Sequence, residues 1–334
     1  MSRFSIILPV RNGGYLIKEC VGSILAQSLQ DFELLVLENN SSDDTPAWLN
    51  TLTDPRIKII PSVQSLTIEQ NWGRVVSIPK GEFMTIIGHD DVLDKNYLET
   101  MDHLIHQYPD ASLYQAHFRY IDKDGREVRK CVPMKEVQQP AEVLRNFITS
   151  RMDIMGTGFM MRSRDYEAVG GIPPYANLLF ADMELFIELA RKSYLAVSPT
   201  ECFSYRTHPG ATTSVSTDAK VYQAFDRFVN YLEQLKSKDH ALAGVIETDA
   251  DHLLRQYCQG ITHKVLRTPR ARRQTPSVAA IIDQFRDYGK RLKGNTRFEP
   301  LAFKKIKMGR TIDTNPVLHS LFLLFKKIYS KPIY

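Results

Sequence analysis

Two adjacent carboxylates, Asp90 and Asp91, follow directly on an apolar run at residues 83–87. The run has the length and composition of a strand that is buried on both faces of a parallel sheet. Ligands of open α/β sheets bind at the carboxyl ends of such strands. Neighbouring carboxylates repel each other there unless a cation neutralises them, so a divalent metal such as Mn²⁺ or Mg²⁺ suits the pair. A solvated turn or a helix cap is the alternative.

The segments that must position this pair alternate between strand and helix patterns. Short apolar runs and amphipathic runs follow one another at residues 5–9, 16–25, 31–37, 56–60, 66–79 and 83–87. Such alternation predicts an α/β fold with a doubly wound, mostly parallel sheet and right-handed crossovers. The crevice at the strand ends would be lined by the loops that follow Leu37 and Ile87.

The chain lacks the glycine loops that usually bind phosphate groups. It has no G-x-x-x-x-G-K-[ST] motif, and no G-x-G-x-x-G follows the first predicted strand. No basic residues cluster in the first 110 positions, so a cation would have to neutralise a bound diphosphate. This favours the metal interpretation of Asp90 and Asp91. It argues against a nucleotidyltransferase, which would need a glycine-rich, basic loop after the first strand.

The charge of the chain is distributed unevenly. Residues 1–260 carry 26 Lys and Arg against 34 Asp and Glu, whereas residues 261–334 carry 17 against 4. A basic C-terminal region predicts an anionic partner surface. The four cysteines are scattered, which fits a reducing compartment, and no apolar stretch is long enough to predict a membrane span. The expected location is the cytoplasm, with attachment to the inner face of the cytoplasmic membrane left open.

The N-terminal motifs resemble the opening of family 2 glycosyltransferases, which have the A-type nucleotide-sugar-binding fold. The resemblance covers about residues 3–210 and rests on SIILP with Asn12, ECVGSILAQS at 19–28, DFELLV at 31–36, KGEF at 80–83 and the pair Asp90-Asp91. It implies an inverting glycosyltransferase that uses a nucleoside-diphosphate sugar, with a UDP-sugar favoured. The acceptor would be a hydroxyl of a saccharide or lipid-linked saccharide in cell-surface polysaccharide synthesis.

The resemblance also implies which residues contact the donor. Residues at the end of the first strand would border the base, and Glu38 and Asn39 stand where the family commonly has two aspartates. Arg11 replaces a frequent aromatic residue, and it would either contact phosphate or a charged sugar or remain solvated. The predicted donor-binding residues are Pro9, Val10, Arg11, Glu38, Asn39, Asn71, His89, Asp90, Arg206 and His208.

The metal motif of the family is Asp-x-Asp, and here the segment reads Gly88-His89-Asp90-Asp91. The first carboxylate is missing, Asp90 matches the acid that usually holds the metal, and Asp91 is its neighbour. We expect lower metal affinity rather than none, because Mg²⁺ or Mn²⁺ keeps waters and takes ligands from the diphosphate. His89 is either a borderline ligand that favours Mn²⁺ or an exposed loop histidine.

The catalytic base is assigned by the same resemblance. Asp182 stands at the start of a predicted helix and matches the acid that serves as the base, although Ala181 replaces a common second acid. A helix cap is the alternative role of Asp182, and Glu184 is the alternative base. The later segment Tyr205-Arg206-Thr207-His208-Pro209-Gly210 resembles the Tyr-Arg-x-His segment of the family, where Arg206 or His208 would stabilise the leaving diphosphate.

The predicted domains are a catalytic domain at 1–214, with a nucleotide-sugar half at 1–110 and an acceptor half at 111–214, and a helical region at 215–334. Residues 315–334 form an apolar helical face flanked by lysines, the pattern of an interfacial helix that contacts anionic lipid. Docking on the domain or on a second subunit, as in a homodimer, is the alternative. Nucleic-acid binding is not expected, since aromatic residues are sparse among the basic ones.

One alternative function comes from the missing acids. Gly88, Asn39 and Ala181 stand where the family has carboxylates. A catalytically inactive module that binds sugar nucleotides or glycans would tolerate these replacements.

Overall fold

The computed structural model describes residues 2–208, 217–294 and 297–329. Two compact units form: the first unit comprises Met1–Val143 and Met152–His208, and the second comprises Leu144–Arg151 and Pro209–Tyr334. The predicted domain boundary at residue 214 lies outside the described residues. The segment 144–151, which we predicted to belong to the catalytic domain, groups with the second unit.

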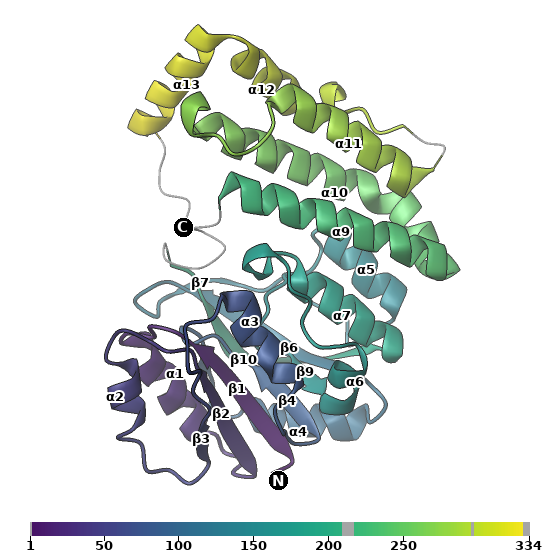
Figure 1. Cartoon of the computed structure of the whole chain (residues 1–334). Helices are drawn as coiled ribbons and strands as arrows, with labels where there is room; N and C mark the ends of the chain where they lie inside the picture. Colours follow the sequence, from purple (N-terminus) through teal and green to yellow (C-terminus); the bar gives the residue numbers. More distant parts are fainter. Residues whose placement is uncertain (1, 209–216, 295–296, 330–334) are drawn as a thin grey trace. The chain divides into compact units, whose positions relative to one another are not determined.

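A mixed, mostly parallel sheet forms the core of the first unit (Figure 1). Its strand order is β3-β2-β1-β4-β9-β6-β10-β5, with β7 beside β6 and β8 beside β10. The pairs of β1 with β2 and β4, β2 with β3, and β6 with β10 are parallel. The strands are β1 (Phe4–Val10), β2 (Phe32–Glu38), β3 (Ile57–Ile59), β4 (Phe83–Ile86), β5 (Val92–Leu93), β6 (Leu113–Ile121), β7 (Glu127–Lys130), β8 (Val137–Gln138), β9 (Met160–Arg162) and β10 (Leu195–Arg206).

The register of the sheet brings three predicted loops to one edge. Val10 at the end of β1 lies opposite Glu38 at the end of β2, and Ile7 lies opposite Ile86 at the end of β4. All residues of these three strands are buried, which explains their continuous apolar sequences. The loops after β1, β2 and β4 therefore lie side by side, as the sequence predicts.

Helices cover the sheet and connect its strands. The helix predicted at 16–25 forms with those bounds, whereas the one predicted at 66–79 divides into α3 and a 3₁₀ turn. Thr67 and Gln70 cap α3 reciprocally, which fixes where it begins. The helices are α1 (Leu16–Leu25), α2 (Thr45–Leu49), α3 (Ile68–Gly73), η1 (Arg74–Val76), α4 (Tyr97–Gln107), α5 (Pro140–Ile148), α6 (Ser163–Ala168), η2 (Ala176–Leu178) and α7 (Ala181–Lys192).

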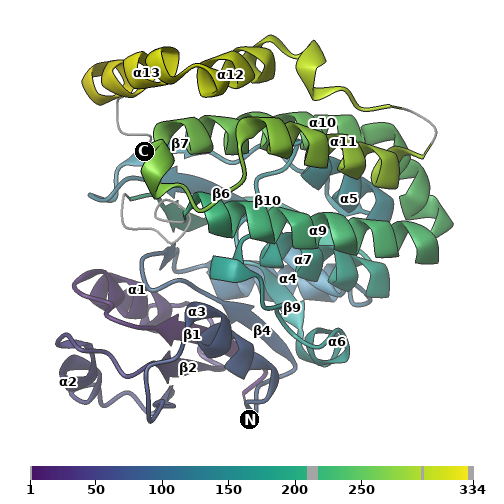
Figure 2. The same cartoon turned by 45° about the horizontal axis from the view of Figure 1, so that its top comes forward.

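The described part of the second unit is helical (Figure 2). Stacked rings of Phe225, Tyr257 and Phe285 join its first three long helices, with centroids 4.7 and 5.2 Å from that of Phe225. Among the described helices, none is both long and apolar enough to cross a membrane. The elements are α9 (Asp218–Lys238), α10 (His240–Arg267), η3 (Arg270–Arg272), α11 (Val278–Lys293), η4 (Pro300–Ala302), α12 (Lys304–Thr314) and α13 (Pro316–Tyr329).

The basic segment after α10 is held by a buried ion pair. The guanidinium of Arg273 binds Oδ1 of Asp313, while Oδ2 of Asp313 accepts a hydrogen bond of 2.9 Å from the backbone N–H of Val278. His319 at the start of α13 is also buried and contacts the carbonyl of Leu266 at 2.9 Å. These contacts fix α12 and α13 to the ends of α10 and α11.

Gly158→Ala is expected to destabilise the first unit. Gly158 has a φ of +77°, and a Cβ there would lie 2.7 Å from ring carbons of Phe203. Left-handed strain and overpacking together should cost about 2–4 kcal/mol of unfolding free energy. The matched control is Gly22→Ala on α1, where nothing lies within 4 Å of the added Cβ and a gain of up to about 1 kcal/mol is expected. Thermal unfolding followed by circular dichroism measures both, and equal melting temperatures for the two variants would contradict this account.

Candidate functional site

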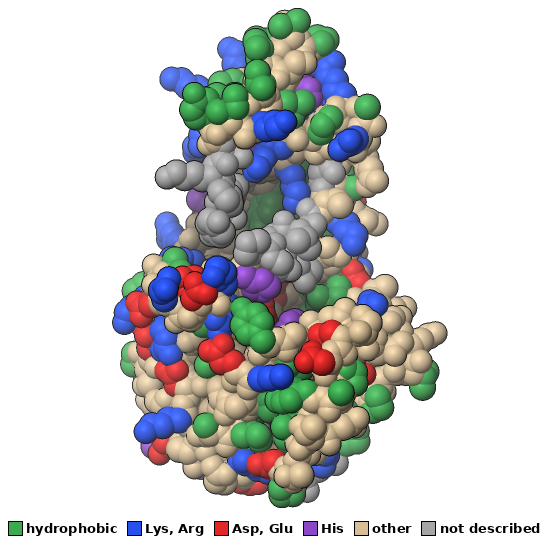
Figure 3. Space-filling view, turned by 90° about the vertical axis from the view of Figure 1, so that its left-hand side faces the viewer, with side chains coloured by type: hydrophobic (Ala, Val, Ile, Leu, Met, Phe, Trp, Pro, Cys, Tyr) green, Lys and Arg blue, Asp and Glu red, His purple; other side chains and the backbone are tan. Residues whose placement is uncertain are grey.

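Asp90 lies in the loop that follows β4, at the carboxyl edge of the sheet. Its Oδ2 is 2.8 Å from Nε2 of His208, and its backbone carbonyl accepts a hydrogen bond of 2.7 Å from Nε of Arg206. Burial alone would raise the pKa of Asp90, but the hydrogen bond to His208 holds it below the usual value. Asp90 is therefore an ionised, half-buried carboxylate. Histidine side chains reach the surface near acidic and basic ones on the face seen in Figure 3.

Asp91 is buried and binds the chain itself. Its Oδ2 accepts a hydrogen bond of 2.7 Å from Oγ1 of Thr157, and its Oδ1 accepts one of 2.9 Å from the backbone N–H of Arg206. Burial, followed by the neighbouring charge of Asp90, raises the pKa of Asp91 well above its usual value. Each oxygen thus has a protein partner. The predicted metal role of Asp91 stays a prediction.

The buried guanidinium of Arg206 joins three parts of the first unit, since its side chain is only 1% exposed. Besides the bond to Asp90, Nη2 donates to Oε2 of Glu19 on α1 at 2.7 Å. Nη1 donates to the carbonyls of Asp122 and Lys123 in the turn between β6 and β7, at 3.2 and 3.3 Å. These contacts indicate that Arg206 positions the Asp90 loop. Direct contact of Arg206 with a diphosphate stays a prediction.

Gly88, which replaces the first acid of the family motif, lies close to both carboxylates that follow it. A Cβ at this position would lie 2.7 Å from Oδ1 of Asp90 and 3.1 Å from Oδ2 of Asp91. An aspartate here would therefore displace one of the two carboxylates that follow. His89 is half-buried, and burial lowers its pKa, so this ring favours the neutral form.

The predicted base-binding residues are held by their own loops. Asn39 donates from Nδ2 to the carbonyl of Leu66 at 3.0 Å and accepts at Oδ1 from the N–H of Leu66 at 2.7 Å. The carboxylate of Glu38 accepts hydrogen bonds from the N–H groups of Ser41 and Asn40, at 2.7 and 3.1 Å. Both side chains are buried. Contact of either one with a base stays a prediction, and it would compete with these bonds.

Asn71 supports the end of β2 from α3. Its Nδ2 donates to the carbonyl of Leu37 at 3.2 Å, and its Oδ1 accepts from Nη1 of Arg74 at 3.0 Å. At the end of β1, Pro9 and Val10 are buried whereas Arg11 is exposed. Only Arg11 of this set offers a charged side chain to a ligand without giving up a hydrogen bond seen in the structure.

Asp182 is the second residue of α7, and its Oδ1 accepts a hydrogen bond of 2.9 Å from the N–H of Met183. The preceding segment is strained, since Asn177, Leu178 and Phe180 have φ values of 54°, 56° and 69°. Burial raises the pKa of Asp182 to about 6. Strain and a raised pKa at one position are typical of functional sites. The alternative base, Glu184, accepts a hydrogen bond from the hydroxyl of Tyr175.

One ring contact joins α7 to the segment whose Thr157 binds Asp91, and Tyr205 lies within electrostatic reach of both acidic positions. The rings of Phe159 and Phe186 stack with centroids 4.1 Å apart, and Phe159 lies two residues after Thr157, which binds Asp91. The phenol of Tyr205 is within electrostatic reach of Asp91, Asp90 and Asp182, whose charges add to burial in raising its pKa. Both acidic positions thus lie around the end of β10.

Sequence reasoning did not single out Glu19, Thr157 or Tyr205 as functional. Thr157 stands between two glycines, Gly156 and Gly158, a pattern that could have drawn attention to it. Glu19 looks like an exposed helix residue until Arg206, far away in the sequence, is brought against it.

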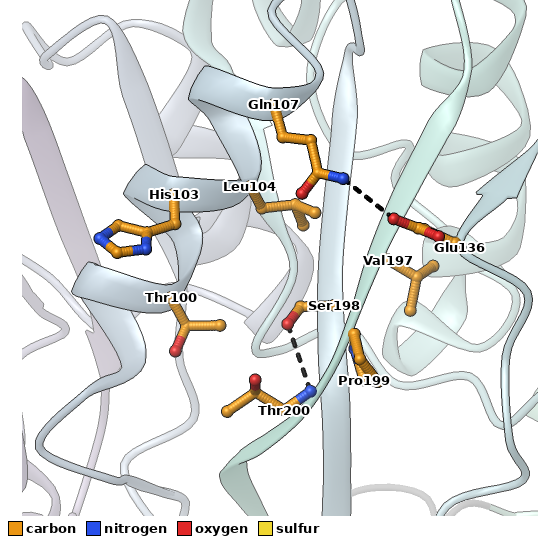
Figure 4. A pocket seen from close by; sticks show the side chains of 9 residues that line it. All are labelled: Thr100, His103, Leu104, Gln107, Glu136, Val197, Ser198, Pro199 and Thr200. Atoms are coloured by element: carbon orange, nitrogen blue, oxygen red, sulfur yellow. Dashed lines mark hydrogen bonds between the residues drawn. The ribbon is translucent and has the colours of Figure 1, made fainter.

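A separate hollow lies between α4 and β10 (Figure 4). It has a volume of about 150 Å³, below the range of roughly 300–1,000 Å³ that is usual for ligand sites. Its polar side chains bind each other, as in the 3.1 Å bond from Gln107 to Glu136. None of the predicted site residues lines it.

Within residues 2–208, 217–294 and 297–329, no three His, Cys, Asp or Glu side chains gather as a ready metal site. Within the part of the chain that the structure describes, His208 is the side chain bonded to the carboxylate of the predicted ligand Asp90. All predicted site residues, from Pro9 to His208, lie within the described residues. Pro209 and Gly210 of the last predicted segment lie outside them.

Comparison with known proteins assigns the first unit to a family. Residues 5–170 match the model of the family described as glycosyl transferase family 2. The chain carries a family 2 glycosyltransferase domain. The matched residues include the Asp90 loop and the Gly156–Gly158 segment, so the predicted resemblance is confirmed.

Two relatives show how far the similarity extends in sequence. The UDP-Glc:alpha-D-GlcNAc-diphosphoundecaprenol beta-1,3-glucosyltransferase WfgD of Escherichia coli is 30% identical over 95 residues, 28% of this chain and 38% of WfgD. The GalNAc(5)-diNAcBac-PP-undecaprenol beta-1,3-glucosyltransferase of Campylobacter jejuni is 32% identical over 105 residues, 30% of this chain and 34% of that enzyme. The chain therefore spans little more than a third of the length of these curated relatives.

Two solved structures share the fold of this family 2 protein. TarS residues 1–349 from S. aureus, in complex with UDP-GlcNAc, superposes with a TM-score of 0.60 at 13% identity, covering 93% of this chain and 90% of that one. The mannosyltransferase PcManGT from Pyrobaculum calidifontis, in complex with GDP-Man and Mn²⁺, gives 0.50 at 15% identity, covering 98% and 88%. The predicted A-type glycosyltransferase fold is confirmed.

His208 is expected to titrate above the usual histidine pKa in the metal-free protein, because Asp90 accepts a hydrogen bond from its ring and stabilises the cation. Asp90→Asn should lower this pKa. Since the folded-state value lies above the unfolded one, the pair stabilises the fold below the unfolded pKa, and this contribution is lost as pH rises through the folded pKa.

NMR titration of the histidine rings in EDTA measures the pKa. Asp44→Asn, which removes an exposed carboxylate that does not bind His208, is the control. An unchanged His208 titration in Asp90→Asn would show that the pair does not form in solution.

Proposed function

We propose that this chain is an inverting glycosyltransferase. It moves a sugar from a nucleoside-diphosphate sugar, with a UDP-sugar favoured, to a hydroxyl of a saccharide or lipid-linked saccharide in cell-surface polysaccharide synthesis. The observation that carries the proposal is the pair of acids in a family 2 domain. Asp90 is ionised in the loop after β4, and Asp182 is a half-buried carboxyl on α7, whose Phe186 stacks on Phe159 next to the Thr157 that binds Asp91.

Asp182 is the proposed catalytic base. Its pKa of about 6 leaves it deprotonated at neutral pH while its affinity for a proton is higher than that of an ordinary aspartate. In the reaction, the acceptor hydroxyl gives its proton to the carboxylate of Asp182 as its oxygen bonds to the anomeric carbon. The bond between that carbon and the diphosphate oxygen breaks on the opposite face, and the electron pair leaves with the diphosphate. The anomeric configuration is therefore inverted.

His208 and Asp90 form the proposed diphosphate end of the site. Asp90 raises the pKa of His208, so the imidazolium is favoured next to the carboxylate. A positive charge there would stabilise the negative charge that develops on the leaving group. Arg206 keeps the loop in place through the Asp90 carbonyl, which makes it a positioning residue.

The residues present fit a divalent cation held mainly by Asp90. This carboxylate is ionised and half-buried, and its Oδ2 is bound by His208. Oxygen ligands suit Mn²⁺ or Mg²⁺, both of which readily accept waters and diphosphate oxygens as the remaining ligands. When bound, the cation would neutralise charge on the diphosphate. PcManGT was solved with GDP-Man and Mn²⁺, which supports the choice of metal.

The donor and acceptor classes follow from the named relatives. TarS was solved with UDP-GlcNAc, and the two beta-1,3-glucosyltransferases are named for acceptors linked to undecaprenol diphosphate. We therefore favour a UDP-sugar and a lipid-linked saccharide. The proposed place of action is the cytoplasm, at the inner face of the cytoplasmic membrane, where such an acceptor would be presented.

A binding module without catalysis is the alternative function. Asn39 satisfies both its polar groups on Leu66, and Gly88 and Ala181 replace acids of the family. A module of this kind would bind the nucleotide sugar and release neither free sugar nor a transferred product.

Asp182→Asn is expected to lower kcat by about 10²- to 10⁴-fold, because the acceptor proton loses its base. The dissociation constant for UDP should not change. In the wild type, kcat/KM should fall as pH drops below about 6, where Asp182 becomes protonated, and this limb should disappear in the variant. The control is Glu184→Gln, which removes the alternative base. Full activity of Asp182→Asn, or loss of activity only in the control, would remove Asp182 from this role.

Asp90→Ala is expected to weaken metal-dependent binding of UDP by roughly tenfold or more, since it removes the proposed protein ligand. Isothermal titration calorimetry with UDP, with Mn²⁺ and then with EDTA, measures this. EDTA should lower the affinity of the wild type and leave that of the variant unaltered, with Asp44→Ala behaving as wild type. An affinity of the wild type that EDTA does not change would count against the cation.

A further inference from the structure

Helix α13 presents a row of apolar side chains to solvent. Val317, Leu321, Leu324 and Ile328 follow one another at helical spacing and are 55–67% exposed. Phe325 and Tyr329 extend the row, with their rings stacked 4.9 Å apart. Single exposed apolar residues are ordinary, but a contiguous row of this kind marks an interaction surface.

Basic side chains surround the row. Residues 304–329 contain six Lys and Arg against a single acid, Asp313, which is buried and paired with Arg273. On α12, Lys304, Lys305 and Lys307 are exposed. Hydrophobic and basic side chains gather at the top of the view in Figure 3. This surface therefore complements an anionic partner with an apolar interior.

A groove adjoins the row between α10, α12 and α13. Its volume is about 690 Å³, and Leu266, Met308, Phe322 and Phe325 contribute to an apolar lining. Lys305 and Lys326 stand among the lining residues, and the ammonium of Lys326 is 5.9 Å from the centroid of Phe322. At Gly260 of α10 nothing lies within 4 Å of an added Cβ, so this glycine keeps the groove open.

The groove and the row are fixed relative to each other. A Cβ on Gly309 would lie 2.6 Å from Thr262, so α12 packs closely on α10 at this point. Asp313 and His319 are buried at the junction of α12 and α13, and the side chain of Arg273, 9% exposed, pairs with Asp313. The apolar residues therefore lie on a surface that is already ordered before a partner binds.

We propose that α12 and α13 form a docking surface for an anionic lipid bilayer. The row of α13 enters the acyl boundary, the groove takes part of a lipid chain, and the lysines of α12 and α13 contact anionic headgroups. An apolar face with a basic surround and one internally paired acid is the pattern of a helix that lies in the membrane interface. A second copy of the chain would bring the same basic surround against itself, which disfavours a dimer through this face.

Vesicle flotation of the full chain tests the proposal without donor or acceptor, so its failure leaves the proposed transfer reaction untouched. The chain should float with vesicles of equal parts phosphatidylcholine and phosphatidylglycerol, and far less with phosphatidylcholine alone or at high salt. Leu321→Glu with Leu324→Glu should reduce partitioning more than tenfold. Lys327→Gln should reduce it about fivefold.

The control is Val63→Glu, which places a single glutamate on a fully exposed valine of the first unit and should float as wild type. Gly260→Leu, which fills the groove, should reduce partitioning, and unchanged flotation would remove the groove from the proposal. Equal flotation of the wild type and the double variant would overturn the proposal. A wild type that is dimeric in solution, with a double variant that is monomeric, would also overturn it.

Discussion

The buried guanidinium of Arg206 is the constraint on which the rest of the site depends. Burial of a charged group is costly unless its hydrogen bonds are satisfied, and here a carboxylate and three backbone carbonyls satisfy them. Through these contacts the end of β10 is bound to α1, to the Asp90 loop and to the turn after β6. The same residue holds Asp91 with its backbone N–H. His208, two residues further, consequently meets the carboxylate of Asp90.

In this arrangement the neighbouring acids Asp90 and Asp91 have different roles. Asp91 is turned inward and bound at both oxygens, so it anchors the loop, whereas Asp90 remains half-buried and ionised. Thr157 extends the anchor toward Phe159, whose ring stacks on Phe186 of α7. Asp182 is carried on that helix in a less polar setting that raises its pKa. The environment of Asp90 lowers its pKa, which suits it to bind a cation, whereas the environment of Asp182 raises its pKa, which suits it to accept a proton.

The sequence predicts the strands and the loop edge well, because buried parallel strands are recognisable as continuous apolar runs such as residues 5–9 and 83–87. It also places Asp90, Asp91 and Asp182 by resemblance. It does not predict that the guanidinium of Arg206 donates its hydrogen bonds to Glu19 and to backbone carbonyls, because these hydrogen bonds join residues that are far apart in the chain. For the same reason it does not predict the ion pair of Arg273 and Asp313, which makes the basic segment after α10 part of the helical packing. The apolar row of α13 is evident from helical spacing alone, but the groove beside it requires α10 and α12 in place.

The most direct test of this account is a crystal structure of the protein with UDP and Mn²⁺, with the metal located by anomalous scattering. We expect the metal and the diphosphate next to Asp90, the carboxyl of Asp182 facing the same cavity, and Arg206 still bound to Glu19 and to the Asp90 carbonyl. A nucleotide bound away from Asp90, or a carboxyl of Asp182 that faces away from that nucleotide, would contradict the account.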